Sequence, residues 1–562
     1  MNRFASLALI PFALLALGPS AADSRPAADL IVRNARIWTV DASRPEAEAL
    51  AVLQGRFVAV GSNRAVGAWQ GPATRMVDAG GRRLLPGFND AHVHFSDGGV
   101  ALVGVQLNDA TSEADMARRI GAQAAKTPPG DWVRSGNWDE TKWSPAALPT
   151  RATLDPFTGA TPVAVDRYDG HAVLANSAAL RLAGITAATV DPAGGVIVRD
   201  GRGEPTGVLK DAAVSLLEAA IPPPSHAQRR AAIERAMQHA AELGVTSVQD
   251  MAVDYADVAV YAELLEQGRL TVSVQVAPLI TQVDDQARLG IRRAFGGPML
   301  RIGALKAFAD GSLGSRTAYF FEPFVDRSGE RGLLSDEMTP PELMRERMKR
   351  ADAAGLQLCT HAIGDAGISA ILDIYAVIAA AHGPRDRRWR IEHAQHMAAN
   401  DFTRFADLKV IASVQPYHAI DDGRWAEQRI GHDRASRTYA FRTFLDHGVL
   451  LALGTDWPVA PLDPLATLYA ATTRATLDGK HPDGWFPEQK LTIREAIAAY
   501  TMGSSYAEFQ DGDKGSITPG KLADFVLLSD DPLAMTPVQL RHRHVAQTWL
   551  GGQLIYSADT RR

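Results

Sequence analysis

The chain has 562 residues, of which 46% are hydrophobic and 22% are charged, and these proportions exclude an intrinsically disordered protein. A formal net charge of −6 argues against a polyanionic partner such as nucleic acid. Cys359 is the single cysteine, which excludes an intrachain disulfide, so a conventional hydrophobic core must stabilise the fold.

The first 22 residues have the layout of a secretory signal peptide. Arg3 lies in a short basic head, an apolar run follows over residues 5–17, and small residues precede the expected cleavage site near Ala22. An uncleaved membrane anchor is the alternative, but the run is short for a membrane span. We therefore expect an exported protein, periplasmic or secreted, without membrane contact after cleavage. The Ala- and Arg-rich composition is compatible with a bacterial source, which favours the periplasm.

Both ends of the mature chain have the pattern of short strands separated by turns. Residues 28–87 alternate apolar and polar positions, and residues 511–557 repeat that pattern with Gly-rich turns between the apolar runs. We expect these two segments to pair into one β-sandwich domain.

Residues 88–510 alternate candidate buried strands with helical stretches, as parallel βα units do. The eight segments that contain the candidate strands are 84–95, 244–253, 270–278, 302–311, 355–365, 389–397, 410–418 and 449–459. Periodicity alone does not distinguish a barrel from a doubly wound sheet, but the count of eight favours the barrel. The predicted fold class is therefore α/β, a (β/α)8 TIM barrel joined to the terminal β-sandwich.

An insert of about 100–230 separates the first two candidate strands and is much longer than an ordinary βα connection. Long insertions at the catalytic face of a barrel shape the substrate pocket, so we expect this segment to be a cap. Its tryptophans Trp132, Trp138 and Trp143 could form an aromatic wall for the substrate, and ordinary core packing is the alternative.

Two histidines, His92 and His94, end the first candidate strand. Residues two apart on a strand share a face, so both imidazoles can reach one cation. His361, His393 and Asp456 lie at the ends of the fifth, sixth and eighth candidate strands, and imidazole nitrogens with a carboxylate suit zinc or a similar ion. Each residue alone could be an ordinary buried histidine or a turn aspartate; their shared position favours a metal site.

Several motifs carry a family resemblance over essentially the whole mature chain. They are LPGFNDAHVHF, the Arg-x-Asp-Gly-His element from Arg167 to His171, LKAFADGSLGSRTA, THAIGDAG, IEHAQ, QPYH, GTDWPV and GKLADFVLL. In these motifs the chain resembles the amidohydrolase superfamily, specifically its amidohydrolase 3 or YtcJ-like branch.

The resemblance implies one further ligand, Lys306, which looks like the lysine that many members carboxylate to form a metal-bridging carbamate. An amine adds carbon dioxide only when neutral, and burial favours that form. The alternative is a lysine paired with Asp310. The implied site holds two metal ions, most simply zinc: His92, His94 and Asp456 bind one, His361 and His393 bind the other, and Lys306 spans both.

The implied reaction is attack of a metal-bound hydroxide on a substrate carbonyl, with Asp456 transferring the proton to the departing nitrogen. His171 is a second catalytic candidate, because it could polarise the carbonyl or contact the leaving group. The expected substrate contacts are Arg167, Asp169, Gln415, Tyr417 and His418. An ion pair of Arg167 with Asp169 that only orders the loop is the alternative for the first two, and the other three could equally be structural.

The leading interpretation is hydrolysis of a non-peptide carbon–nitrogen bond in a small molecule, such as an amide, an N-formyl group or a cyclic amide. A deaminase or an ester or lactone hydrolase could use the same site. A non-catalytic exported binding protein is the third alternative, which the intact set of ligands opposes. A homo-oligomer is compatible with the sequence.

Overall fold

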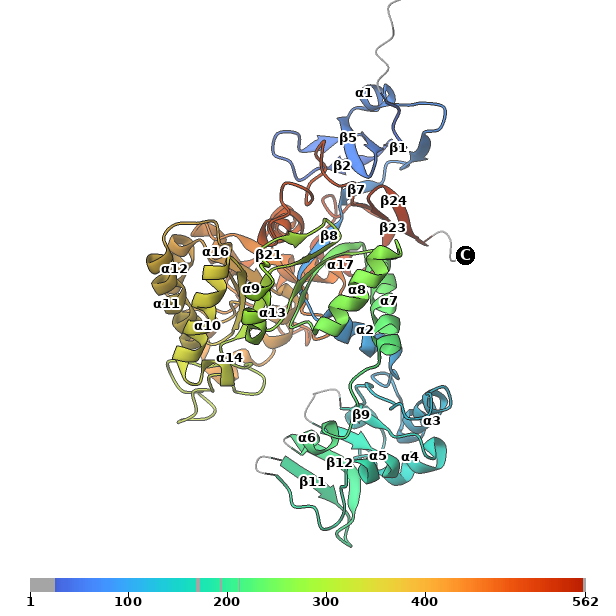
Figure 1. The fold of residues 1–562 in the computed structure, drawn as a ribbon, viewed down its shortest axis with the longest axis vertical. Coiled ribbons are helices and arrows are strands. Elements are labelled where there is room, and N and C mark those ends of the chain that lie inside the picture. The colour runs from blue at the N-terminus through green and yellow to red at the C-terminus, as the bar shows by residue number, and fades with distance from the viewer. Residues whose placement is uncertain (1–25, 168–171, 193–194, 212, 559–562) are drawn as a thin grey trace, which may run out of the picture.

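The computed structural model describes residues 26–558 except residues 168–171, 193–194 and 212 (Figure 1). The expected signal peptide lies outside the described residues. Figure 1 shows three parts along the long axis: a β unit formed by the first and last described strands, a central α/β body, and a lobe formed by the insert.

The terminal β unit contains two sheets that share a buried core. The first sheet has the order β5-β4-β1-β6 and the second has the order β24-β23-β22-β7-β2-β3. The strands are β1 (Leu30–Arg33), β2 (Arg36–Trp38), β3 (Glu46–Ala47), β4 (Ala49–Leu53), β5 (Arg56–Gly61), β6 (Arg75–Asp78), β7 (Arg83–Pro86), β22 (Phe525–Leu528), β23 (Val545–Leu550) and β24 (Gln553–Ser557). The two ends of the chain meet where β7 pairs antiparallel with β22, with Leu85 opposite Val526. Phe57 from the first sheet and Trp549 from the second lie in one hydrophobic cluster, so side chains of both sheets bury one another.

The central body contains two parallel sets of strands. One set comprises β8 (Phe88–Val93), β13 (Val245–Met251) and β14 (Ser273–Ala277), and the other comprises β17 (Ala304–Phe308), β18 (Gln357–Ala362), β19 (Arg390–His393), β20 (Ile411–Val414) and β21 (Leu451–Leu453). Each of the eight expected segments contains one of these strands. Parallel bridges Leu279–Lys306 and Val93–Trp457 connect the two sets at both edges. The carboxyl ends of the strands therefore meet at one end of the body.

Helices cover these strands, which explains why every residue of β13 is buried. They include α2 (Phe95–Val103), α7 (His226–Leu243), α8 (Tyr255–Glu266), α9 (Val283–Arg288), α10 (Pro341–Ala354), α11 (Asp365–His382), α12 (Asp401–Leu408), α13 (Pro416–Asp422), α14 (Ala426–Ile430), α15 (His432–Ala435), α16 (Phe441–Asp446), α17 (Pro464–Thr473), α18 (Ile493–Ala498) and α19 (Ser504–Ala507). A capping box of Ser225 and Gln228 begins α7, and Gly244 ends it at φ 80°.

Among the described residues, α11 alone is long and apolar enough by composition to cross a membrane. Of this 18-residue helix, 56% is buried inside the protein.

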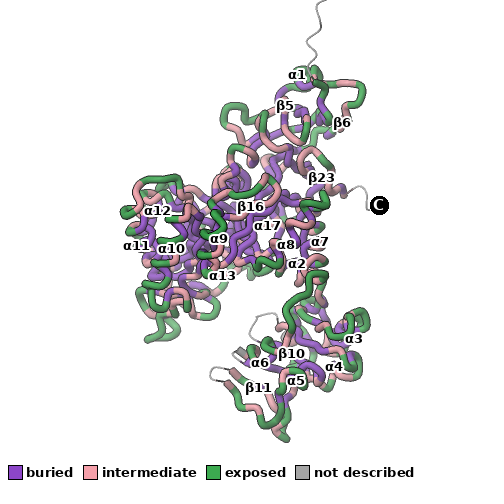
Figure 2. The backbone as a smooth tube through the Cα atoms, viewed as in Figure 1, coloured by how far each residue is buried: buried purple, intermediate pink, exposed green. Residues whose placement is uncertain are grey.

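The insert forms a lobe with its own hydrophobic interior (Figure 2). It contains α3 (Glu113–Ala124), α4 (Arg151–Thr158), α5 (Ser177–Leu182), α6 (Val214–Glu218) and a sheet of order β11-β12-β10-β9, with β9 (Ala164–Asp166), β10 (Ala172–Ala175), β11 (Gly195–Arg199) and β12 (Pro205–Asp211). The lobe begins after residue 100, because α2 packs on α7 and belongs to the central body. Trp138 and Trp143 are buried in the core of the lobe, and Trp132 packs against its second cluster, so core packing explains these residues.

Candidate metal centre

His92, His94 and Asp456 converge at the carboxyl end of the strands. One ligand atom from each lies within 4.8 Å of the other two. Asp456 Oδ1 is 3.4 Å from Nε2 of His92 and 3.4 Å from Nε2 of His94. The backbone holds the group together, because the Asp456 N–H donates to the His92 carbonyl at 2.7 Å and the His94 N–H donates to the Trp457 carbonyl at 2.8 Å. The structure thus brings Asp456 beside His92 and His94, from which it is far apart in the sequence.

His361, His393 and His418 surround the other side of Asp456. The rings of His361 and His393 are 4.7 Å apart between centroids, and the ring of His393 is 4.9 Å from that of His92. Among the described residues, His393, His418 and Asp456 form a second group of potential ligand atoms within 4.8 Å. His418, which we expected as a substrate contact, lies with Nε2 3.9 Å from Asp456 Oδ2. His361 is adjacent to this group.

Each of the four expected histidine ligands has one ring nitrogen held by an oxygen acceptor. Nδ1 of His92 contacts Glu392 Oε2 at 2.7 Å, and Nδ1 of His94 contacts the Met251 carbonyl at 3.1 Å. Nε2 of His361 contacts the Gly311 carbonyl at 3.1 Å, and Nδ1 of His393 contacts Gln415 Oε1 at 2.8 Å. An acceptor at one nitrogen places the proton there and leaves the lone pair of the other nitrogen for a metal. This donor set fits a divalent cation.

The ionisation of Asp456 and of three of the expected histidine ligands suits metal binding. Burial opposes the charged form of His94, but its hydrogen bond to Asp456 raises its pKa above the usual value. Burial, followed by the nearby Lys306 charge, lowers the pKa of His92 to about 4 and that of His361 to about 3. Burial also lowers the pKa of His393. Burial opposes ionisation of Asp456, but the His94 hydrogen bond and the neighbouring imidazoles hold its pKa below the usual range. Neutral imidazoles and an ionised carboxylate are the forms that bind a metal.

Lys306 is buried at the centre of the cluster. Its Nζ is 3.2 Å from Nε2 of His92 and 4.8 Å from the centroid of the Phe308 ring. Burial lowers the pKa of the Lys306 ammonium. Asp310, the alternative partner of this lysine, is held by the backbone N–H groups of three other residues, Tyr319, Ile363 and Gly364, at 2.8 to 2.9 Å.

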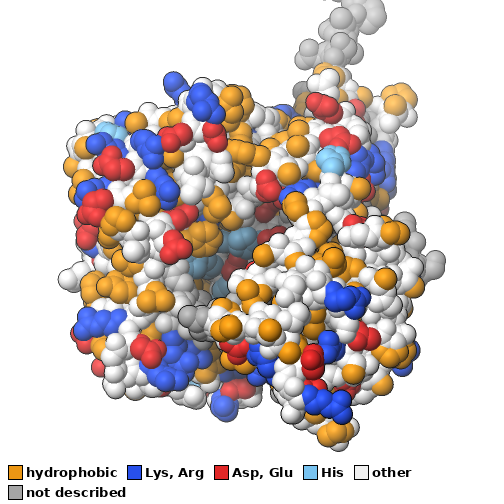
Figure 3. All heavy atoms as spheres, turned by 60° about the horizontal axis from the view of Figure 1, so that its bottom comes forward, with side chains coloured by type: hydrophobic (Ala, Val, Ile, Leu, Met, Phe, Trp, Pro, Cys, Tyr) orange, Lys and Arg blue, Asp and Glu red, His pale blue; other side chains and the backbone are white. Residues whose placement is uncertain are grey.

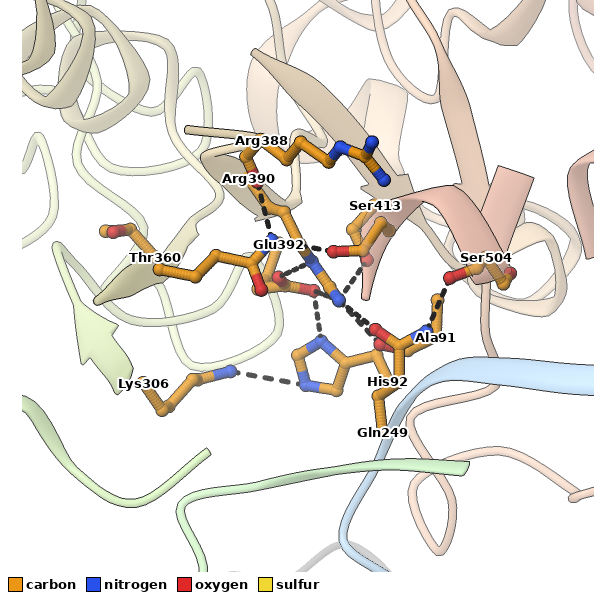
Figure 4. A network of polar contacts seen from close by, with 12 residues as sticks. Ala91, His92, Gln249, Lys306, Thr360, Arg388, Arg390, Glu392, Ser413 and Ser504 are labelled. Atoms are coloured by element: carbon orange, nitrogen blue, oxygen red, sulfur yellow. Dashed lines mark hydrogen bonds and ion pairs between the residues drawn. The ribbon is translucent and has the colours of Figure 1, made fainter. Parts of the chain in front are cut away.

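A buried ion pair behind His92 was missed from the sequence (Figure 4). Arg390 Nε donates to Glu392 Oε1 at 2.7 Å and Arg390 Nη2 donates to Glu392 Oε2 at 2.9 Å, and both side chains are 0% exposed. Burial opposes the charge on Glu392, but the Arg390 guanidinium and the His92 N–H hold the pKa of that carboxyl below its usual range. The available signal was the spacing of Arg390 and Glu392, two charged residues on one face of a strand that is buried throughout.

A cavity of about 450 Å³ opens onto this cluster. Figure 3 shows histidine side chains at the base of a hollow between the central body and the insert lobe. The lining residues beyond the cluster include Phe308, Leu313, Ile363, Gln395, Tyr417, Asp421, Asp422 and Val459. Of the three expected substrate contacts in this segment, Tyr417 and His418 line the cavity and Gln415 holds the ring of His393; their contact with substrate stays a prediction.

Of the substrate contacts expected from the insert, Arg167 is described and is held by an ion pair. Arg167 donates to both carboxylate oxygens of Glu140, at 2.9 and 2.6 Å, and lies 5.9 Å from the centroid of the Trp138 ring. Asp169 and His171 lie outside the described residues, so their assignment stays a prediction.

The sequence profile described as the amidohydrolase family matches residues 75–556. The chain belongs to the amidohydrolase family. This membership confirms the resemblance seen in the motifs.

Several curated relatives match along nearly the full chain. The protein LONG AFTER FAR-RED 3 of Arabidopsis thaliana is 36% identical over 94% of this chain and 92% of its own length. The putative amidohydrolase YtcJ of Bacillus subtilis is 31% identical over 92% of this chain and 98% of its own length. An N-substituted formamide deformylase of Arthrobacter pascens is 29% identical over 94% of this chain and 98% of its own length.

A solved structure shares the fold. The chain superposes on an uncharacterized metal-dependent hydrolase from Pyrococcus horikoshii with a TM-score of 0.77 and 28% identity, over 91% of this chain and 99% of that one. The protein is therefore an α/β metal-dependent hydrolase of the amidohydrolase family that acts on carbon–nitrogen bonds, and the family implies a divalent metal.

Proposed function

We propose that this amidohydrolase hydrolyses small non-peptide amides, N-formyl compounds or cyclic amides at a centre of two divalent metal ions, most simply zinc. The observation that carries the proposal is the convergence of His92, His94 and Asp456 with His393 beside one cavity. The relative described as an N-substituted formamide deformylase supports N-formyl compounds as the first class to test.

The proposed metal ligands divide into two sets that share Lys306. His92, His94 and Asp456 would hold one ion, and His361 and His393 would hold the other. Lys306, carboxylated on Nζ, would bridge them, and its buried position supports the neutral amine that adds carbon dioxide. His418 is an additional candidate ligand, because its buried Nε2 has no hydrogen-bond partner among the described residues.

When bound, the metal ions supply a polarised substrate carbonyl and a water of lowered pKa. Asp456 performs the proton transfer in our proposal: one carboxylate oxygen accepts the proton of the attacking water and delivers it to the departing nitrogen. Its Oδ2 is 3.9 Å from His418 Nε2, which is beyond hydrogen-bond distance. Tyr417 can contact the substrate from the cavity wall, and Arg167, Asp169 and His171 remain proposed contacts from the insert.

We also propose the detailed architecture of the fold and the location of the protein. The bridges at both edges of the parallel strands support a (β/α)8 barrel, the shared core of the terminal sheets supports a β-sandwich, and the hollow beside the insert lobe supports a cap. The basic head and apolar run of residues 1–22 support export to the periplasm or the medium.

A deaminase and an ester or lactone hydrolase remain alternatives, because the same donor set can serve all three reactions. The complete set of ligands opposes a non-catalytic binding protein, which would have no use for it.

The deciding experiment combines metal analysis with a substrate panel. The mature protein, purified without chelators, would be analysed by inductively coupled plasma mass spectrometry and assayed against N-substituted formamides, cyclic amides, lactones and aminopurines. Release of formate and amine from formamides, lost after chelation and restored by zinc, is the expected result. Turnover of lactones or aminopurines alone would select one of the alternatives, and failure to bind any metal would refute the proposed centre.

A further inference from the structure

The acceptors behind the four expected histidine ligands are chemically unequal. Three of the acceptors are neutral. His94 contacts the Met251 carbonyl, His361 contacts the Gly311 carbonyl, and His393 contacts the Gln415 side-chain oxygen. The acceptor of His92 is the carboxylate of Glu392, at the shortest distance of the four, 2.7 Å. The imidazole of His92 therefore has a carboxylate at hydrogen-bond distance, and the other three imidazoles have a neutral acceptor there. Asp310 Oδ1 lies 3.6 Å from Nε2 of His361, which is beyond hydrogen-bond distance.

The charge of Glu392 is fixed by its own partner. An arginine guanidinium is always protonated and can only donate, and Arg390 donates to both oxygens of Glu392. Arg390 also donates to Ser413 Oγ at 2.9 Å, to the Ala91 carbonyl at 2.5 Å and to Gln249 Oε1, which holds its orientation (Figure 4). Glu392 is thus an acceptor only, so the His92 proton lies on Nδ1 and the lone pair lies on Nε2.

An anion behind a metal-bound imidazole strengthens the bond to the metal. The imidazole gains positive charge when Nε2 donates its lone pair, and the carboxylate stabilises that charge more than a carbonyl dipole does. Removing such an outer partner weakens metal affinity by about 10- to 100-fold. The effect should be confined to the metal position that contains His92.

We propose that the two metal positions differ in affinity and that Glu392, as a positioning residue acting through His92, makes the position of His92, His94 and Asp456 the first to fill. This inference rests on the two-metal site of the proposed function. It assigns a role to Glu392 and Arg390, which do not line the cavity. The backbone of Glu392 neighbours His393 and pairs with His361, but among the expected histidine ligands its carboxylate hydrogen-bonds His92.

The test is a metal titration that does not depend on activity. Apoprotein made by chelation would be titrated with Co²⁺, with the visible absorption of the bound ion and competition with a chelator as readouts. In the wild-type protein we expect two steps that differ by about 10-fold or more. Glu392→Gln keeps the shape and one acceptor oxygen, and it should weaken the first step by about 10- to 100-fold while changing the second step little.

Gln415→Ala is the matched control, because it removes the neutral acceptor of His393 and should weaken the second step only. If Glu392→Gln fails to fold because Arg390 is left unpaired, the double variant Arg390→Met with Glu392→Gln removes both charges. Circular dichroism spectra of each apoprotein would establish that the variants are folded.

Equal affinities in the wild-type protein, or a first step that Glu392→Gln leaves unchanged, would overturn this inference. If the wild-type protein binds a single ion, weaker binding by Glu392→Gln would support the inference. Weaker binding by Gln415→Ala alone would oppose the inference. Two unequal steps without hydrolysis of any substrate would refute the proposed reaction and leave the role of Glu392 intact. Binding of no ion by the wild-type protein would refute both.

Discussion

The hydroxyl of Thr455 donates a 2.8 Å hydrogen bond to Asp90 Oδ2 and so joins β8 to the loop that carries Asp456. The Thr455 N–H donates to Asp90 Oδ1 at 2.9 Å, and the Tyr500 hydroxyl donates to Oδ2 at 2.8 Å. Asp90 is fully buried between these donors. The Asp90 side chain therefore fixes the first and the last parallel strands relative to each other. Asp90 lies two residues before His92 in the sequence.

Replacing Asp90 should destabilise the protein. Asp90→Ala leaves several buried donors without an acceptor, so we expect a loss on the order of 3 kcal/mol in the free energy of unfolding. Urea denaturation followed by circular dichroism measures this loss. Asp90→Asn retains an acceptor oxygen and should cost less. A loss below about 1 kcal/mol for Asp90→Ala would show that the strands are held without this contact.

Asp456→Asn should separate metal binding from turnover. The amide keeps an oxygen near His92 and His94 but cannot accept a proton, so most of the metal should remain and kcat should fall by about 100-fold or more. Metal analysis and an assay on the best substrate of the panel measure both quantities. Asp373→Asn, which affects an exposed ion pair with Arg404, is the control. Near-normal turnover of Asp456→Asn would remove Asp456 from the proposed proton transfer.

Lys306 should carry a carbamate. Native mass spectrometry of the mature protein should show one added carbon dioxide that disappears in Lys306→Met, together with a fall from about two metal ions to about one. Lys306→Arg keeps a positive charge but has no amine to carboxylate, so it should resemble Lys306→Met. An unmodified wild-type chain that binds a single metal ion would contradict the bridge.

The pair of Arg442 and Glu495 should contribute pH-dependent stability. Hydrogen bonds from Arg442, at 2.9 Å between Nη1 and Oε1, lower the pKa of Glu495 to about 2. Because the unfolded value is about 4.3, the contribution is fully present above that pH and is lost as the pH falls toward 2. The pair is partly exposed, so Glu495→Gln should cost no more than about 1 kcal/mol at neutral pH.

Urea denaturation of both proteins at about pH 7, 5 and 3.5 checks this pH dependence. The difference between wild type and Glu495→Gln should shrink at the lowest pH. A difference that stays constant or grows on acidification would contradict the assignment.

A simple geometric rule predicts from the sequence that the candidate metal ligands lie close together. His92, His361, His393 and Asp456 each lie at or near the carboxyl end of a candidate strand, and such ends meet at one edge of parallel strands. The distances were not predictable in this way. His418 rather than His361 completes the second close group, since that depends on how α13 is oriented after β20.

Residues whose role depends on burial were harder to predict. Glu392 was missed because its partners Arg390 and His92 are fixed only by the packing of neighbouring strands. The tryptophans of the insert were compatible with a pocket wall or a core, and only their burial in the lobe decides between them. The helix α2, which ends at Val103, packs on α7 of the central body, and the sequence has no signal that identifies this partner.

The pairing of Leu85 with Val526 has a consequence for biosynthesis. A ribosome delivers β7 early and β22 almost last, so β7 must wait with an open edge until the C-terminal strands emerge. An open strand edge is a site of aberrant pairing between chains. A polypeptide that terminates before Phe525 should therefore aggregate or be degraded in the cell, even though every proposed metal ligand has already been synthesised.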